Sequence, residues 1–183
     1  MSGLEVVFAS YFITQSSVNA NTSLQINIRK AVSRALGVIM KVTDNVTTVN
    51  NDSTASTAWK FTQLQARVGA LYFPQQPLQG DTVQGVSREM YYHTCRGFNK
   101  IGTPSAPPQT SYNDFMVRNG VFCQDLERSS VQQLTGIPIN NSRSLEISAK
   151  FEDVAAATGK LVDTWLTYTR LARVFLNNIE VEE

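Results

Sequence analysis

Short segments in which apolar and polar residues alternate are the feature that most limits how this chain can fold. Leu24, Ile26 and Ile28 alternate with polar residues, and the same period of two runs through residues 62–72. Successive side chains of a β-strand point to opposite faces, so each such segment is predicted to be a strand with one buried face. Polar stretches with proline or glycine separate these segments, which is typical of a β-sandwich or barrel.

The pattern predicts about eight strands in a single domain that spans residues 1–183. The predicted strands cover residues 4–14, 23–29, 36–42, 62–72, 115–123, 144–151, 161–168 and 172–181, with a hairpin or bend at 169–171 and a polar surface loop at 43–57. The run at 36–42 is almost continuously apolar, which indicates a strand that is buried on both faces or leads to a bend at Gly37. This all-β pattern fits an antiparallel jelly-roll sandwich, and an immunoglobulin-like sandwich fits the same strand count.

One short helix is predicted to interrupt the strands. Pro74 and Pro77 are expected to form a turn that ends the strand at 62–72, because proline donates no ladder hydrogen bond. Ser87 can then cap a helix over residues 87–99, in which apolar side chains recur at spacings of three and four. We expect core packing, rather than ligand stacking, to explain the aromatic residues nearby, which are Tyr72, Phe73, Tyr91, Tyr92 and Phe98.

The residues that could carry out catalysis are few. His93 is the single histidine, so one chain cannot assemble a metal site from several histidines. Cys95 lies two positions from His93, where residues of a helix face different directions, so a nucleophile and base pair is not expected. Cys95 and Cys123 form no metal-binding motif, and we expect both thiols to be buried in a reducing compartment. No cofactor is predicted.

Asp125 and Glu127 offer the best geometry for acid and base chemistry, because period two places both on one face of a strand end. A hydrolase that uses this pair is therefore one alternative function. Arg128 follows directly, so the simpler interpretation is an ion-paired strand end. The adjacent acidic residues Glu152 and Asp153 form the other carboxylate pair.

Charge and hydropathy argue against two classes of partner. Sixteen basic and fifteen acidic residues give a formal charge of +1, and the basic residues are scattered, so direct nucleic-acid binding is not expected. The first residues resemble neither a signal peptide nor an anchor, and no apolar run is long enough to span a membrane. We therefore expect synthesis in the cytoplasm of a cell.

Several stretches, in order, resemble the second, C-terminal jelly roll of the double jelly-roll major capsid proteins of nucleocytoplasmic large DNA viruses, virophages and polinton-like viruses. These stretches are QARVGALYFPQQPLQG at 65–80, SREMYYHTCRGFNK at 87–100, GVFCQDLERSSVQQLTGIPINNSRSLEISAKF at 120–151 and the closing segment LVDTWLTYTRLARVFLNNIEVEE. Members of that family carry two jelly rolls, whereas 183 residues hold one. The chain is thus either a segment of a longer capsid protein or a relative with a single jelly roll.

The resemblance implies a non-enzymatic capsid subunit that assembles into trimeric, pseudo-hexagonal capsomers of an icosahedral virion, beside other capsid proteins. The residues expected to make assembly contacts are Pro74, Gln75, Gln76, Pro77, Leu78, Glu127, Arg128 and Arg143. The alternative from another class is a jelly roll that binds carbohydrate or a receptor, such as a spike head or a lectin-like module. Exposed aromatic residues beside Asn and Asp would favour that alternative.

Overall fold

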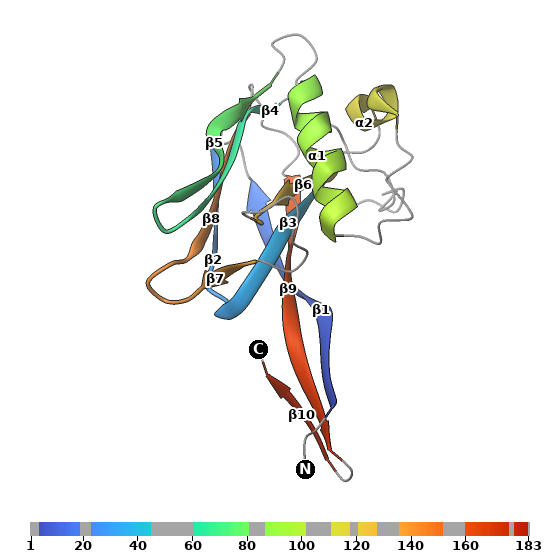
Figure 1. Ribbon diagram of the computed structural model, residues 1–183. Coiled ribbons are helices and arrows are strands. Elements are labelled where there is room, and N and C mark those ends of the chain that lie inside the picture. The colour runs from blue at the N-terminus through green and yellow to red at the C-terminus, as the bar shows by residue number, and fades with distance from the viewer. Residues whose placement is uncertain are drawn as a thin grey trace.

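The computed structural model describes residues 4–18, 23–44, 61–80, 87–101, 111–117, 121–127, 136–151, 160–175 and 178–182, which form two antiparallel sheets and two helices. The six-stranded sheet contains β1 (Leu4–Val18), β3 (Val32–Asp44), β6 (Val121–Asp125), β7 (Ile137–Ile139), β9 (Lys160–Phe175) and β10 (Asn178–Glu182). The four-stranded sheet contains β2 (Ser23–Ile28), β4 (Phe61–Val68), β5 (Leu71–Gln79) and β8 (Leu145–Phe151). Helix α1 (Arg88–Ile101) and the short α2 (Tyr112–Val117) lie beside one end of the sandwich (Figure 1).

The order of the strands distinguishes between the two sandwich types. The sheets run β1-β9-β3-β6 and β2-β8-β4-β5, with β10 paired to β9 and β7 paired to β3. Without the short β7 and β10, the first strand pairs with the last, the second with the seventh, the third with the sixth, and the fourth with the fifth. The chain thus folds as a long hairpin wound on itself, which is the jelly roll and not the immunoglobulin order.

The core lies between the two sheets. Buried residues alternate along β4 and β8, so Leu64, Ala66 and Val68 face Val38, Met40 and other residues of the six-stranded sheet in one hydrophobic cluster. In the central strand β3 the residues from Leu36 to Val38 are all buried, whereas Ile39 and Lys41 are half-buried, so both faces are covered over only part of the predicted strand. The register with β9 also shifts between Ala35 and Gly37, close to the predicted bend. The predicted jelly roll and its all-β character are therefore correct.

The number of strands was underestimated, since the described residues contain ten. The predicted strand at 62–72 is two strands, β4 and β5, joined by a tight turn at Gly69 and Ala70. Gly69 has a φ of 60°, a conformation that glycine adopts without strain. Apolar alternation continues through this two-residue turn, so the sequence pattern did not reveal it. The three-residue strand β7 was also not predicted.

Three other boundaries were wrong. Phe115 lies in the second helix, α2, and β6 begins only at Val121. β9 continues through residues 169–171 without a break, and β10 follows it after Phe175. Thr43 belongs to β3 rather than to the polar loop, whose remaining residues after Asp44 lie outside the described part of the chain.

Helix α1 confirms the helix prediction closely. The Ser87 side chain accepts a hydrogen bond from the backbone N–H of Met90 at 3.2 Å and so caps the first turn. Met90, Thr94 and Gly97 are buried at spacings of four and three, and this face packs chiefly against β6. Of the nearby aromatic residues, Phe73 and Tyr91 pack against the core as expected, but Tyr72 and Tyr92 are exposed.

Candidate assembly surfaces

The two prolines predicted to form a turn lie inside the edge strand β5. Leu64 pairs with Leu78 and Ala66 pairs with Phe73, so four residues of β5 bulge opposite the single residue Gln65. The Gln65 side-chain amide donates hydrogen bonds to the carbonyl oxygens of Pro74, at 3.1 Å, and Gln75, at 3.2 Å. Proline and bulges both prevent another strand from adding to a sheet edge. This edge is therefore suited to contacts between side chains rather than to strand addition.

Gln65 is expected to hold the bulge in place. Gln65→Ala should lower the free energy of unfolding by about 1–2 kcal/mol, because it removes a part-buried hydrogen bond to the Pro74 carbonyl and an exposed one to the Gln75 carbonyl. Gln63→Ala is the matched control, because the Gln63 amide makes one long bond of 3.4 Å with the exposed side chain of Gln79. Chemical denaturation monitored by fluorescence measures both changes. Equal losses for the two variants would contradict the role assigned to Gln65.

We call β5, which contains Pro74 and Pro77, the proline strand. A shallow groove runs beside this strand and brings together three of the predicted contact residues. Pro74, Gln75 and Glu127 line the groove with four residues of the β4–β5 hairpin, Ala70, Leu71, Tyr72 and Phe73. Gln76 is exposed on the same strand, and Pro77 is half-buried. Leu78 is only 2% exposed and belongs to the core, so its side chain does not reach this surface. Arg128 lies outside the described residues.

Tyr72 is held in position at this groove by a charged pair. Arg67 pairs with Tyr72 in the sheet register, and its guanidinium contacts Glu146 of β8 at 2.6 Å. Hydrogen bonding to Tyr72, followed by the hydrogen bond and charge of Glu146, raises the pKa of Arg67. The exposed face of the four-stranded sheet therefore carries an ordered polar cluster next to the proline strand.

Arg143 lies at the end of the same sheet. It closes a turn with Asn140, in which the backbone N–H of Arg143 donates to the Asn140 carbonyl at 3.0 Å. The aliphatic part of the Arg143 side chain lies against Gly69, where an added Cβ atom would be 3.3 Å from Arg143 Cγ. Arg143 therefore covers the tip of the β4–β5 hairpin, which also contributes Ala70 to the groove.

A second surface, which the sequence reasoning missed, is the three-stranded ribbon formed by β1, β9 and β10 where they extend beyond the sandwich (Figure 1). We call this segment the ribbon; it comprises residues 4–8, 170–175 and 178–182. Among the described residues, twelve large hydrophobic side chains are exposed, and seven of them lie in the ribbon: Leu4, Val6, Val7, Phe8, Phe175, Ile179 and Val181. A concentration of exposed apolar side chains often marks an interaction site.

The comparisons with known proteins give matches to solved structures only. No family model matches the sequence, and no curated protein does. The major capsid protein of Faustovirus matches with a TM-score of 0.61 and 7% identity, over 94% of this chain and 34% of that one. The crystal structure of PBCV-1 VP54, fitted into a reconstruction of the virophage Sputnik, matches with a TM-score of 0.53 and 9% identity, over 98% and 51%. A quasi-atomic model of the PBCV-1 capsid gives 0.50 and 8%, over 99% and 52%.

The chain has the jelly-roll fold of viral major capsid proteins. It spans about half of the PBCV-1 chains and a third of the Faustovirus chain. The family resemblance seen in the sequence is thus supported by a fold-level likeness, at identities of 9% or less.

Asp125 and Glu127 lie where the chain leaves β6, and Asp125 stabilises the backbone there. Asp125 is buried at the end of β6, and its carboxylate accepts a hydrogen bond from the backbone N–H of Glu127 at 2.9 Å. This contact fixes the turn at which the chain leaves the sheet. Glu127 is half-buried and lines the groove beside β5. Glu152 and Asp153 lie outside the described residues.

The two thiols differ in their exposure. Cys123 is buried as expected, whereas Cys95 is only half-buried, which corrects the prediction. Burial raises the pKa of the Cys123 thiol far above its ordinary value, and Asp125 adds to this effect. The thiol is the unreactive form of cysteine, so Cys123 serves packing rather than nucleophilic chemistry. In the described residues, no group of three or more His, Cys, Asp or Glu side chains could hold a metal ion.

His93 should make stability depend on pH. Burial, together with Arg96, lowers the pKa of His93 below its ordinary 6.5, although Glu89 and Asp125 act in the opposite direction. The unfolded chain therefore binds a proton more readily than the folded one. This component of stability is complete above about pH 6.5 and is lost as the pH falls through the lower folded-state pKa. In melting curves from pH 8 to pH 5, His93→Gln should lose less stability than the unchanged chain; parallel curves would contradict this.

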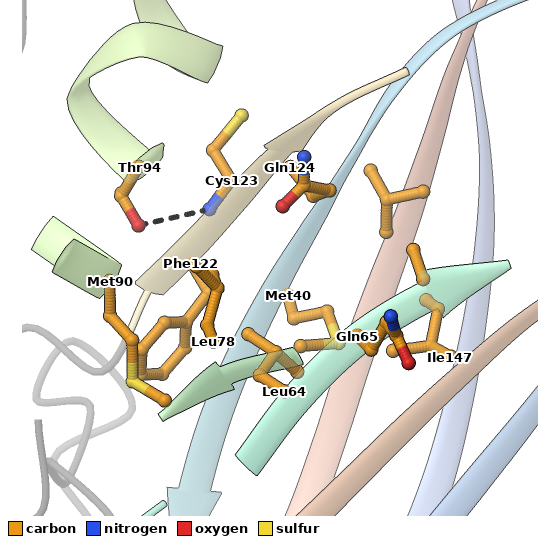
Figure 2. Close-up of a pocket in the computed structure, with 12 residues that line it drawn as sticks. Met40, Leu64, Gln65, Leu78, Met90, Thr94, Phe122, Cys123, Gln124 and Ile147 are labelled. Carbon is orange, nitrogen blue, oxygen red and sulfur yellow. Dashed lines mark hydrogen bonds between the residues drawn. The ribbon is translucent and has the colours of Figure 1, made fainter. Parts of the chain in front are cut away.

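The cavity between the sheets is too small for a ligand. Figure 2 shows it between α1, β6 and the four-stranded sheet, lined mainly by apolar side chains such as Met40, Leu78 and Met90. Its volume is about 20 Å³, roughly the space of one water molecule. At its rim the Cys123 backbone N–H donates to the Thr94 hydroxyl at 3.5 Å. No helix in the described part of the chain is both long and apolar enough to cross a bilayer.

Proposed function

We propose that this chain is a structural subunit of a viral capsid that assembles into homotrimers with a pseudo-hexagonal outline and has no catalytic role. The observation that carries the proposal is the strand order, in which β1 pairs with β9 and β2 pairs with β8. Solved capsid proteins share this fold. Assembly then depends on the sandwich margins, and the virion capsid is the place where the chain acts. The proposed domain, residues 1–183, corresponds to one jelly roll, the second of a longer capsid protein or a single one.

The margin proposed for side-by-side packing is the proline strand with its groove. Gln75 and Gln76 are exposed there, and Pro74, Glu127 and Arg143 lie near the same hairpin. The Gln65 hydrogen bonds and the two prolines hold this margin in one conformation, which lowers the entropy lost on association. Permanent assemblies bury on the order of 2,000 Å² or more, so this margin would contribute one part of a larger contact.

Native mass spectrometry with negative-stain imaging tests the proposal. We expect a trimer and, at high concentration, hexagonal particles or arrays. Gln76→Lys should weaken the trimer because it adds a charge to the edge, whereas Ser148→Lys, on the exposed face of the central strand β8, should leave it intact. A chain that stays monomeric at high concentration would overturn the proposal. Specific binding on a glycan array by that monomer would favour the carbohydrate-binding alternative instead.

A further inference from the structure

The two faces of the ribbon differ in chemistry. Paired residues of neighbouring strands point to the same side of a sheet. One face therefore carries two apolar rows, Leu4–Val174–Ile179 and Val6–Ala172–Val181, and next to them Phe8 pairs with Arg170. The opposite face is mixed: Arg173 lies between Glu5 and Glu180 and contacts Glu5 at 3.0 Å, and the next row is Val7–Leu171–Glu182. The ribbon is thus a three-stranded amphipathic sheet, and we call the side with the two apolar rows its inner face.

The inner face is a continuation of the sandwich interior. β1 pairs with β9 in an unbroken register from Leu4 to Val18, so even-numbered residues of β1 stay on one side throughout. Phe12 on that side packs against the core, and its partner Leu166 is fully buried. Further along the same side, Leu4 is 67% exposed and Val6 42%. The apolar side chains of the buried sheet face thus continue into the ribbon, where no opposing sheet among the described residues covers them.

The size of this uncovered face matches one side of a stable protein contact. Five side chains on it are exposed, namely Leu4, Val6, Phe8, Ile179 and Val181, while Ala172 and Val174 are half-buried. Together they present on the order of 500 Å² of apolar surface, close to the apolar share of the ~800 Å² that each partner contributes to a standard interface. A sheet face of this shape is best covered by another sheet that packs about 10 Å away.

We infer that the inner face of the ribbon binds the inner face of a second copy of this chain, around a two-fold axis. A second copy supplies a sheet of the same width and the same apolar rows, and a two-fold contact uses one patch twice. A lipid surface supplies neither a sheet of matching width nor matching rows of side chains, and flotation with vesicles distinguishes it from a second copy. The inference rests on the proposed capsid function, and this contact lies outside the proposed trimer because it would join one capsomer to the next.

Val6 and Val7 offer a matched pair for the test. They are adjacent residues of the same type on β1, with exposed fractions of 42% and 44%, and they point to opposite faces of the ribbon. Val6→Lys should weaken the two-fold association at least roughly tenfold, because it places a charge at the centre of an apolar contact. Val7→Lys should change it less than about twofold. Sedimentation velocity of the full chain over a range of concentrations measures both constants.

A second variant and a second probe separate the possible outcomes. Ile179→Lys on β10 should reproduce the effect of Val6→Lys. Melting curves test whether both variants remain folded. Loss of larger assemblies with trimers intact supports the ribbon contact. An unchanged chain that forms dimers but no trimers counts against the proposed trimer margin and not against the ribbon. Dissociation of the trimer by Val6→Lys would overturn the inference, because the ribbon would then belong to the trimer contact. Equal behaviour of Val6→Lys and Val7→Lys would overturn the inference. Flotation of the unchanged chain with anionic phospholipid vesicles, abolished by Val6→Lys, would overturn it in favour of a membrane surface.

Discussion

Replacing Phe122 with alanine should lower the free energy of unfolding by about 3–5 kcal/mol, enough to unfold a domain of ordinary stability. Phe122 on β6 is 3% exposed, and its ring meets Phe61 of β4 edge to face at 4.5 Å between centroids. It also contacts Phe115 of α2 at 5.5 Å. One ring thus joins both sheets and the second helix, so its removal leaves a cavity with three separate walls.

The control for Phe122 is a phenylalanine on the same sheet that lacks this burial. Phe175, at the end of β9, is 37% exposed, so Phe175→Ala should cost less than about 1 kcal/mol in the monomer. Phe122→Leu keeps most of the volume and should fall between the two. Urea unfolding at low protein concentration measures all three variants. A loss for Phe122→Ala no larger than that for Phe175→Ala would mean that the aromatic cluster does not hold the sheets together.

Strand positions were predictable from sequence wherever one face is buried and the other exposed. β2 is the simplest case, since Ile26 and Ile28 are buried and the alternating polar residues Gln25 and Asn27 are exposed. The same pattern could not show that β4 and β5 are separate strands. Apolar alternation depends on which face is covered, and both strands of a tight hairpin share one covered face. The positive φ of Gly69, rather than any break in alternation, marks the turn.

Pairing between distant strands could not be predicted from the sequence pattern. β1 and β9 lie side by side although about 150 residues separate them, and the pairs Gln15 with Asp163 and Glu5 with Arg173 form only because of that register. The pattern shows which face of β1 is apolar, but it cannot show where the opposing sheet ends. The inner face of the ribbon therefore resembles an ordinary core segment until the fold is known.

At the proline strand, the sequence predicts a disturbance of strand pairing but not the side-chain hydrogen bonds that stabilise it. The prediction that Pro74 and Pro77 end the strand was wrong, since β5 continues to Gln79, but backbone pairing is interrupted between Phe73 and Leu78. That interruption takes the form of a bulge, in which the Gln65 side-chain amide, instead of a backbone N–H, donates to the carbonyl groups of Pro74 and Gln75. A side chain that satisfies two carbonyl groups across a strand leaves no mark on local sequence periodicity.

Gly97→Val should destabilise the fold by more than about 3 kcal/mol, and Gly97→Ala by roughly 1–3 kcal/mol. Gly97 is a point of close approach between α1 and β6. A Cβ atom there would lie 2.7 Å from Cys123 Sγ and 2.9 Å from the Cys123 carbonyl oxygen. Alanine favours a helix over glycine by about 1 kcal/mol, so a net loss would show that the clash outweighs this gain.

The two contacts of Gly97 make different predictions for a double variant. Cys123→Ala removes the sulfur but leaves the backbone carbonyl in place, so it should recover only part of the stability that Gly97→Ala loses. Arg96→Ala, at the neighbouring exposed position of α1, should change stability by less than about 0.5 kcal/mol. Thermal and urea unfolding measure the four variants. Full recovery in the double variant would place the whole clash on the sulfur, and a stabilised Gly97→Ala would mean that α1 can move away from β6 at little cost.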